Sequence, residues 1–165
     1  MTVDQRFVDW YGAEPARLVS VLALATGDGD VAREATDEAF ARALERWSRV
    51  GHMESPSGWT YRVALNDARR RLRRRSIERA LPAHRVATHT VDIQPTDHEL
   101  WAAVSGLPSR QRTAVALRYV ADLGEREIAE VMRISAGTVA ATLNAARKRL
   151  ATSLAAQGHA ARSTS

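Results

Sequence analysis

The 165-residue sequence contains no cysteine, a single lysine and few aromatic residues. The missing cysteines exclude disulfides, thiolate zinc sites and cysteine nucleophiles. No segment approaches the ~18 uninterrupted apolar residues of a membrane span. The first residues, MTVDQRFVDW, carry acidic side chains in place of an apolar run, so no signal peptide is expected. Apolar residues make up 45% of the chain, enough for a core, and we expect a soluble, cytoplasmic protein without membrane insertion.

The charge is distributed in blocks. All basic residues except Lys148 are arginines, and the formal net charge is +5. Residues 1–68 and 86–109 are net acidic, whereas 69–85 carry eight arginines against one acid and 110–165 carry nine basic residues against four acids. Two separate basic blocks suggest two places where a polyanion could lie. The alternative is that the arginines only coat solvated helix faces. This alternative is weakest for RRRLRRR at 69–75, because so many neighbouring like charges repel each other.

Apolar residues recur at three- and four-residue spacing along most of the chain, and no strand pattern or repeat appears. Asp30 and Ser109 are the expected caps of the second and fifth helices. The pattern predicts helices over 4–25 (starting or kinking at Pro15), 31–48, 59–75, 97–105, 110–119, 125–133 and 136–156.

These elements predict an all-α fold of two small helical domains. A three-helix N-terminal bundle would occupy residues 1–79, and a C-terminal helix-turn-helix domain would occupy 97–156. Residues 80–96, with two prolines and no sustained period, would form a flexible linker, and 157–165 a frayed tail.

The segment 123–150 is typical of a helix-turn-helix, although an ordinary helical hairpin has the same spacing. Ile134 and Val139 would fill the angle between the helices, and Ser135 can cap the second helix, whose free N–H groups favour a phosphate. The predicted outward residues are Ala136, Thr138, Ala140, Thr142 and Asn144, followed by Arg147, Lys148 and Arg149.

The third predicted helix combines aromatic residues with a basic run. Aromatic rings stack on unpaired bases and arginines hold phosphates, which favours single-stranded nucleic acid. The alternative is that Trp59 and Tyr61 belong to the core and the arginines only solvate. The residues concerned are Trp59, Tyr61, Arg62, Asn66, Arg69, Arg70, Arg73 and Arg74.

The sequence contains almost no catalytic or metal-binding pattern. There is no Gly-rich phosphate loop, no GxSxG and no nucleophile–base set, so no enzyme activity and no cofactor are expected. A metal could in principle bind to His84, His89, Asp92 and His98. These residues lack the fixed spacing of a metal site, so no metal site is predicted. The acidic edge around Glu34, Asp37, Glu38 and Arg42 is either a docking face or a solvated face with i,i+4 ion pairs.

Three segments, in order, resemble the sigma factors of bacterial RNA polymerase, in the small extracytoplasmic-function group. Residues 30–49 (DVAREATDEAFARALERWSR) look like the segment that docks on the polymerase β′ subunit. Residues 56–75 (PSGWTYRVALNDARRRLRRR) look like the promoter-melting and −10-reading segment. Residues 107–150 (LPSRQRTAVALRYVADLGEREIAEVMRISAGTVAATLNAARKRL) look like the −35-reading domain.

The resemblance implies a transcription initiation factor that binds core polymerase through its β′ and β subunits, reads duplex −35 and single-stranded −10 DNA, and is restrained by an anti-sigma protein. It assigns polymerase binding to Asp37, Glu38, Phe40 and Arg42, with Phe40 either a contact or a packing residue only. It assigns the −10 strand to Trp59, Tyr61, Arg62, Asn66, Arg69, Arg70, Arg73 and Arg74. It assigns −35 DNA to Arg118, Ser135, Ala136, Gly137, Thr138, Ala140, Thr142, Asn144, Arg147 and Lys148.

The chain departs from the family pattern at several positions. The family usually has Gln where this chain has Asp37, often Gly at Arg133, and basic residues where positions 140, 142 and 145 are Ala, Thr and Ala. Fewer charges on the recognition helix should lower the salt dependence of DNA binding. Two other functions therefore stay open: a regulator that binds duplex DNA without polymerase, and a polymerase-binding decoy that opens no promoter.

Overall fold

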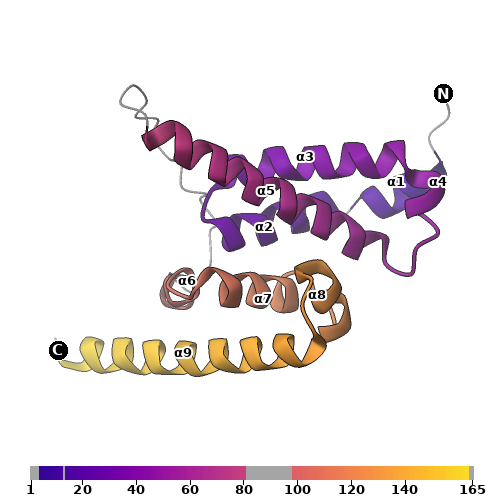
Figure 1. Ribbon diagram of the computed structural model, residues 1–165. Helices are drawn as coiled ribbons and strands as arrows, with labels where there is room; N and C mark the ends of the chain where they lie inside the picture. The colour runs from indigo at the N-terminus through magenta and orange to yellow at the C-terminus, as the bar shows by residue number, and fades with distance from the viewer. Residues whose placement is uncertain (1–3, 13, 81–97, 164–165) are drawn as a thin grey trace.

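The computed structural model describes residues 4–12, 14–80 and 98–163, and these form helices and no strand, so the all-α prediction is confirmed for that part of the chain. The predicted linker began at residue 80, which is the last residue of a helix; the rest of it, with His84, His89 and Asp92, lies outside the described residues. In the order of Figure 1 the helices are α1 (Gln5–Tyr11), α2 (Glu14–Thr26), α3 (Gly29–Glu45), α4 (Trp47–Val50), α5 (Pro56–Ala80), α6 (His98–Ser105), α7 (Ser109–Tyr119), α8 (Glu125–Met132) and α9 (Ala136–Ser163).

The N-terminal half is a bundle of three long helices, α2, α3 and α5, with the short helices α1 and α4 at one end (Figure 1). The single helix predicted over 4–25 is two helices, because the chain breaks near Gly12 and restarts with Pro15 as the second residue of α2, where its missing N–H costs nothing. The cap of α3 is Asp28 and not the predicted Asp30: the Asp28 carboxylate accepts the Val31 N–H at 3.0 Å.

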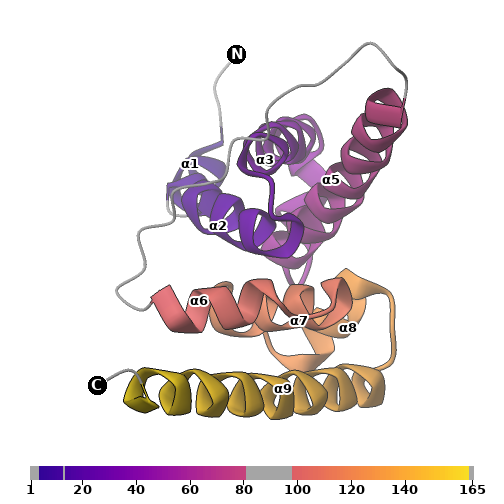
Figure 2. The ribbon, with the colours of Figure 1, turned by 90° about the vertical axis from the view of Figure 1, so that its left-hand side faces the viewer.

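Helix α5 begins earlier than the periodicity predicts. Pro56 is its first residue, and the Ser55 hydroxyl accepts the Gly58 N–H at 3.0 Å. The loop expected up to Gly58 is therefore shorter, and the helix continues to Ala80. Its N-terminal turns lie in the bundle while its basic end projects beyond it (Figures 1 and 2).

The C-terminal half stacks α6, α7 and α8 on the long helix α9. The predicted capping role of Ser109 is wrong, because Ser109 is the first residue of α7. Pro108 occupies the N-cap position, and no side chain caps the helix there. Helix α9 runs to Ser163, through most of the segment for which a frayed tail was predicted. The helix-turn-helix spacing is confirmed by α8, a short turn and α9.

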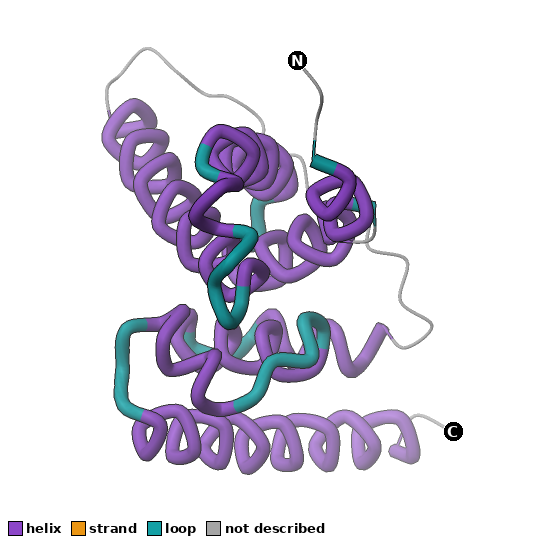
Figure 3. The backbone as a smooth tube through the Cα atoms, turned by 90° about the vertical axis from the view of Figure 1, so that its right-hand side faces the viewer, coloured by secondary structure: helices purple, strands orange, loops and turns teal. Residues whose placement is uncertain are grey.

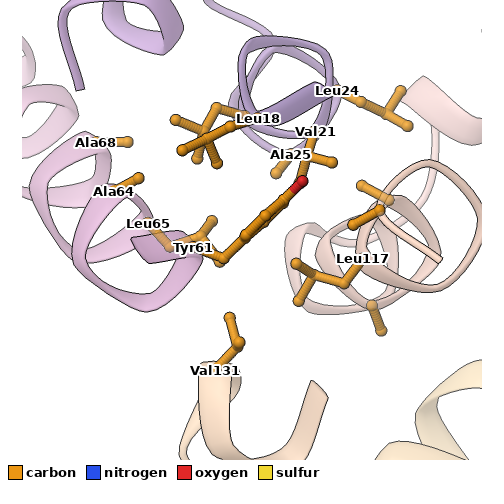
Figure 4. Packing of buried hydrophobic residues seen from close by; sticks show 14 of the residues in the cluster. Leu18, Val21, Leu24, Ala25, Tyr61, Ala64, Leu65, Ala68, Leu117 and Val131 are labelled. Carbon is orange, nitrogen blue, oxygen red and sulfur yellow. The ribbon is translucent and has the colours of Figure 1, made fainter. Parts of the chain in front are cut away.

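The two halves pack against each other, a feature the sequence did not predict. Helix α2 packs on α7, and the N-terminal end of α5 packs on α8, so the described chain forms three stacked layers (Figures 2 and 3). One hydrophobic core runs from α2 and α5 into α7, α8 and α9. Tyr61 fills the centre of this interface with only 1% of its surface exposed, between Leu18 and Val21 of α2, Leu117 of α7 and Val131 of α8 (Figure 4).

Candidate polymerase and nucleic-acid surfaces

The outward face of α3 carries the predicted polymerase-binding residues. Asp37 is exposed, and the Glu38 carboxylate accepts a 2.7 Å hydrogen bond from the Arg42 guanidinium, as the i,i+4 pattern predicts. Phe40 points the other way and packs against the rings of Trp10 and Tyr11, each with centroids 5.1 Å away. Phe40 is thus a packing residue in this conformation.

The three- and four-residue spacing of the apolar residues predicts that Leu44 lies on the buried stripe of this helix, but the structure exposes it. Its side chain is 42% exposed, on the face shared with Asp37 and Ala41. An exposed leucine among charged residues is typical of a docking surface, although single exposed apolar residues also occur without function. The intervals of four and three residues that separate Asp37, Ala41 and Leu44 are the signal in the sequence from which this shared face could have been found.

Aromatic residues of α5 are buried. Trp59 is 8% exposed and packs with Phe7 and Trp47, and Tyr61 lies in the interface of the two halves. Burial raises the pKa of the Tyr61 phenol above its usual range, because the phenolate would have to lose its hydration. Of the predicted −10 residues near them, Asn66 is exposed and Arg62 is half-buried.

The basic run of α5 divides into structural and free arginines. Asp67 is 4% exposed and accepts hydrogen bonds from Arg70 and Arg71, one helical turn further on. Its hydrogen bond raises the pKa of the Arg71 guanidinium. Because a buried carboxylate needs such partners, Arg70 and Arg71 contribute to the fold as well as to surface charge.

Two of these arginines also fasten α5 to α3. Arg71 contacts the Glu34 carboxylate at 2.6 Å, and Arg75 contacts Glu34 at 3.1 Å and Asp28 at 3.0 Å. The sequence analysis did not foresee these roles of Asp28, Glu34 and Arg75, because they join residues more than 35 positions apart.

The remaining arginines of the run point to solvent. Arg69 and Arg73 are exposed and have no hydrogen-bond or ion-pair partner among the described residues, while Arg74 pairs only with Glu78, at 3.3 Å. A row of unneutralised guanidinium groups along one helix can hold a phosphate backbone.

The turn of the helix-turn-helix is held as its sequence predicts. The Ser135 hydroxyl accepts the Thr138 N–H at 3.1 Å and caps α9. Val139 is fully buried between the helices and Ile134 is partly buried. Arg133, at the position where glycine is frequent, adopts the left-handed conformation with φ of 55°.

The outward surface of α9 begins with small residues and ends with cations. Thr142 donates its hydroxyl to the Thr138 carbonyl at 2.7 Å, and Arg147 donates to the Tyr119 hydroxyl at 3.0 Å. Arg118 is half-buried and donates to the Leu123 carbonyl at 3.0 Å, so it stabilises the loop before α8. The exposed predicted residues are Ser135, Ala136, Gly137, Thr138, Asn144, Arg147 and Lys148, with Ala140 and Thr142 half-exposed.

A cleft of about 670 Å³ separates the start of α5 from α8. Ser55, Trp59 and Arg62 line one side, and the other side is formed by α8 and the residue before it. The Ser55 hydroxyl donates to the Glu127 carboxylate at 3.1 Å across the cleft, and Glu127 also accepts the Gly124 N–H at 3.0 Å. No group of three or more carboxylate or histidine side chains within 4–12, 14–80 and 98–163 could hold a metal, and no helix in those ranges is long and apolar enough to cross a membrane.

A helical protein with a helix-turn-helix and a second basic helix is one of the classes that contact nucleic acid. Family models assign it more narrowly: sigma-70 region 2 matches residues 11–77, and sigma-70 region 4 matches residues 97–150. The chain belongs to the sigma factors of bacterial RNA polymerase, in the extracytoplasmic-function group.

Relatives support that membership at modest identity. An RNA polymerase sigma-E factor of Streptomyces coelicolor is 28% identical over 130 residues, 76% of this chain and 73% of the relative. The ECF RNA polymerase sigma factor SigW of Bacillus subtilis is 26% identical over 141 residues, 75% of each chain. An uncharacterised protein of Rhizobium meliloti is 31% identical over 140 residues, and the chain spans only 32% of its length.

Solved structures share the fold. The sigma factor RpoE, in complex with the anti-sigma factor NepR from Bartonella quintana, superposes with a TM-score of 0.75 over 92% of this chain and 98% of that one, at 18% identity. CnrH, in complex with the cytosolic domain of CnrY, gives a TM-score of 0.62 over 93% and 90%, at 17% identity. Both likenesses concern the fold alone.

Proposed function

We propose that this chain is a transcription initiation factor that binds core RNA polymerase, directs it to specific promoters and assists DNA melting. The observation that carries the proposal is the presence of two different nucleic-acid surfaces in one chain, a basic helix with unneutralised arginines and a helix-turn-helix. They occur in the segments that match sigma-70 regions 2 and 4. Residues 1–79 and 97–156 would be the corresponding functional domains.

Core polymerase would dock on the outward face of α3. This face surrounds one exposed apolar side chain, Leu44, with the charged groups of Asp37 and of the Glu38–Arg42 pair. Such an arrangement is suited to a partner helix. Phe40 would act indirectly, by holding α3 against α1. The β′ subunit is the partner that this face would contact.

The −10 strand would follow α5. Arg69, Arg73 and Arg74 would hold its phosphates, while Arg62 and Asn66 lie toward the start of the helix, where an unpaired base can be read. Trapping a flipped base would offset its unstacking cost of a few kcal/mol. Tyr61 could take part only after the two halves separate, because its ring is enclosed by α2, α7 and α8.

The −35 duplex would contact the exposed start of α9. A phosphate would sit at the helix N-terminus near Ser135, and Asn144, Arg147 and Lys148 would contact bases or backbone further along. Because the residues between are small and uncharged, we expect fewer phosphate contacts and a shallow salt dependence.

We also propose that the chain acts in the cytoplasm and that an anti-sigma protein restrains it. Both solved relatives were captured with such a partner or with a cytosolic domain. The chemistry of RNA synthesis would belong to polymerase, and the chain would act by binding alone.

Reconstituted transcription tests the proposal. Purified chain, bacterial core polymerase and a fragment library of the source genome should give discrete start sites that depend on both proteins. Arg73→Ala should weaken the signal, and Arg17→Ala, at an exposed arginine of α2 whose ion pair is with Glu14 at 3.7 Å, is the matched control. Co-elution without transcripts would favour the decoy, and tight duplex binding without polymerase would favour an ordinary regulator.

A further inference from the structure

Tyr119 is a large aromatic residue that the fold leaves in solvent. Its side chain is 59% exposed at the end of α7, whereas Ala116 and Leu117 just before it are fully buried. A single exposed aromatic ring needs no explanation by itself. The position of its hydroxyl group, described next, is what points to a role, because a tyrosine hydroxyl at a surface is well suited to a polar partner.

The Tyr119 hydroxyl joins α7 to the recognition helix, α9. It accepts a hydrogen bond from Nε of the exposed Arg147 at 3.0 Å. A phenol oxygen can accept and donate at the same time, so its own hydrogen stays available for another acceptor. The two Nη groups of Arg147 have no hydrogen-bond or ion-pair partner within the described ranges.

The end of α7 is held firmly, so the hydroxyl has a defined position. Arg118 donates to the Leu123 carbonyl at 3.0 Å, and the Leu123 N–H donates to the Leu117 carbonyl at 3.1 Å. Leu117 itself is anchored in the core. Polar groups that are fixed before binding lose little conformational entropy when a ligand arrives.

The two helices bring only hydrogen-bond donors to this point. Neither α7 nor α9 contains an aspartate or a glutamate, so no carboxylate of these helices neutralises Arg147. Lys148, the next residue of α9, is exposed as well. Two free Nη groups beside a free hydroxyl hydrogen form a set of donors that suits the oxygens of one phosphate group.

The place of Arg147 along α9 favours the backbone of duplex DNA as the source of that phosphate. Because an α-helix rises about 1.5 Å per residue, Arg147 lies about 18 Å along α9 from Ser135. This length exceeds the ~12 Å width of the major groove, so the two ends of this surface can contact the backbones on its two sides. Between them, positions 140, 142 and 145 are uncharged.

We propose that Tyr119 and Arg147 form one phosphate-binding site, the Tyr119–Arg147 site, for the backbone of the duplex that the helix-turn-helix contacts. Arg147 binds the phosphate through its Nη groups, while Tyr119 holds Nε and donates its own hydrogen to the same phosphate. The inference rests on the proposed function and adds Tyr119 to its DNA-binding residues. The site supplies a phosphate contact that the uncharged middle of α9 lacks.

Tyr119→Phe tests the site, because it removes one exposed hydroxyl and keeps the ring. Tyr11→Phe is the matched control: Tyr11 is 43% exposed on α1, in the other half, and its hydroxyl has no hydrogen-bond partner among the described residues. The probe is a short mixed-sequence DNA duplex with a fluorophore. Its binding to the full-length chain is measured by anisotropy at several salt concentrations, and thermal unfolding checks that each variant is folded.

We expect Tyr119→Phe to bind this duplex about three- to tenfold more weakly than the parent chain, and Tyr11→Phe within about twofold of it. Arg147→Ala should lower the affinity and reduce the slope of log K against log salt by about 0.9, the value of one phosphate contact. Arg110→Ala is its control, because it removes an exposed arginine at the other end of α7, and it should change the affinity by less than about twofold.

A double variant separates one shared site from two independent contacts. Because the Tyr119 hydroxyl serves the phosphate that Arg147 holds, Tyr119→Phe should cost less than about twofold when residue 147 is already alanine. An undiminished loss in that background would overturn the shared site. Equal affinity of Tyr119→Phe and the parent chain, an equal loss in Tyr11→Phe, or no duplex binding by the parent chain would overturn it too.

These outcomes are distinguishable from failure of the proposed function. If the variants behave as expected but the chain supports no polymerase-dependent transcription, the initiation role is lost and the site belongs to a duplex-binding regulator. If transcription succeeds while Tyr119→Phe binds the duplex like the parent chain, only the Tyr119–Arg147 site is wrong.

Discussion

Asp28 joins two elements of the N-terminal bundle, and we expect Asp28→Ala to destabilise it by about 2.5–4 kcal/mol. The carboxylate is 6% exposed and caps α3 by accepting the Val31 N–H at 3.0 Å. It also accepts from Arg75 at 3.0 and 3.2 Å. Loss of an N-cap costs about 1 kcal/mol, and loss of charge-assisted hydrogen bonds to a nearly buried group costs about 1.5–3 kcal/mol.

Matched variants separate the two contributions. Asp28→Asn retains a capping oxygen and should cost only the ion pair with Arg75, whereas Arg75→Ala should cost more, because it also removes the pair with Glu34. Arg74→Ala is the control, because its pair with Glu78 is exposed and worth less than about 1 kcal/mol.

Thermal unfolding provides the assay. For a chain of this size 1 kcal/mol corresponds to about 2–4 °C, so Asp28→Ala should lower the midpoint by about 5–16 °C. A midpoint within about 2 °C of the parent chain, or one equal to that of Arg74→Ala, would refute the assignment of Asp28 and Arg75 to the fold.

Four further outcomes are expected. Asn66→Ala should reduce promoter opening more than polymerase binding, measured on one promoter, because its exposed side chain lies where an unpaired base would be read; an equal loss of both would contradict this role. Replacement of Arg73 and Arg74 by Ala should lower promoter affinity most at low salt and flatten its salt dependence, leaving the unfolding midpoint unchanged; unchanged affinity at every salt concentration would mean that these groups only solvate. Burial raises the pKa of Tyr61, so the stability it contributes is complete below about pH 10 and lost as the pH rises toward its folded value; Tyr61→Phe, which also removes a buried hydroxyl with no hydrogen bond to the described part of the chain, should resist alkaline unfolding better than the parent chain. Arg133→Gly should raise stability by about 0.5–1 kcal/mol in urea, because glycine adopts the left-handed conformation without strain, and a loss of stability would contradict this.

Local signals in the sequence predicted the helices and the turn of the helix-turn-helix well. The 3.6-residue period, Pro15, and Ser135 as a cap act within a few residues of themselves, so the structure retains them. The cap of α3 was misplaced by two residues because GDGD offers two aspartates, and only the structure decides between Asp28 and Asp30.

Long-range pairings could not be read from the sequence. Residues 69–75 form a basic run in the sequence, but the structure divides its arginines into two groups. Asp67, Glu34 and Asp28 neutralise some of these arginines, and the others stay unneutralised. Periodicity likewise placed Tyr61 on an apolar face without indicating that α7 and α8 cover it. The two halves are joined through residues 81–97. Contacts between them cannot be predicted from the spacing of residues within one helix.

Promoter opening is the central claim, and it can be measured on a promoter fragment whose −10 region carries a fluorescent base analogue that brightens when unstacked. The account predicts brightening only when core polymerase and this chain are both present, and a weaker signal with Asn66→Ala. Brightening by polymerase alone, or none with both proteins bound to the fragment, would contradict it.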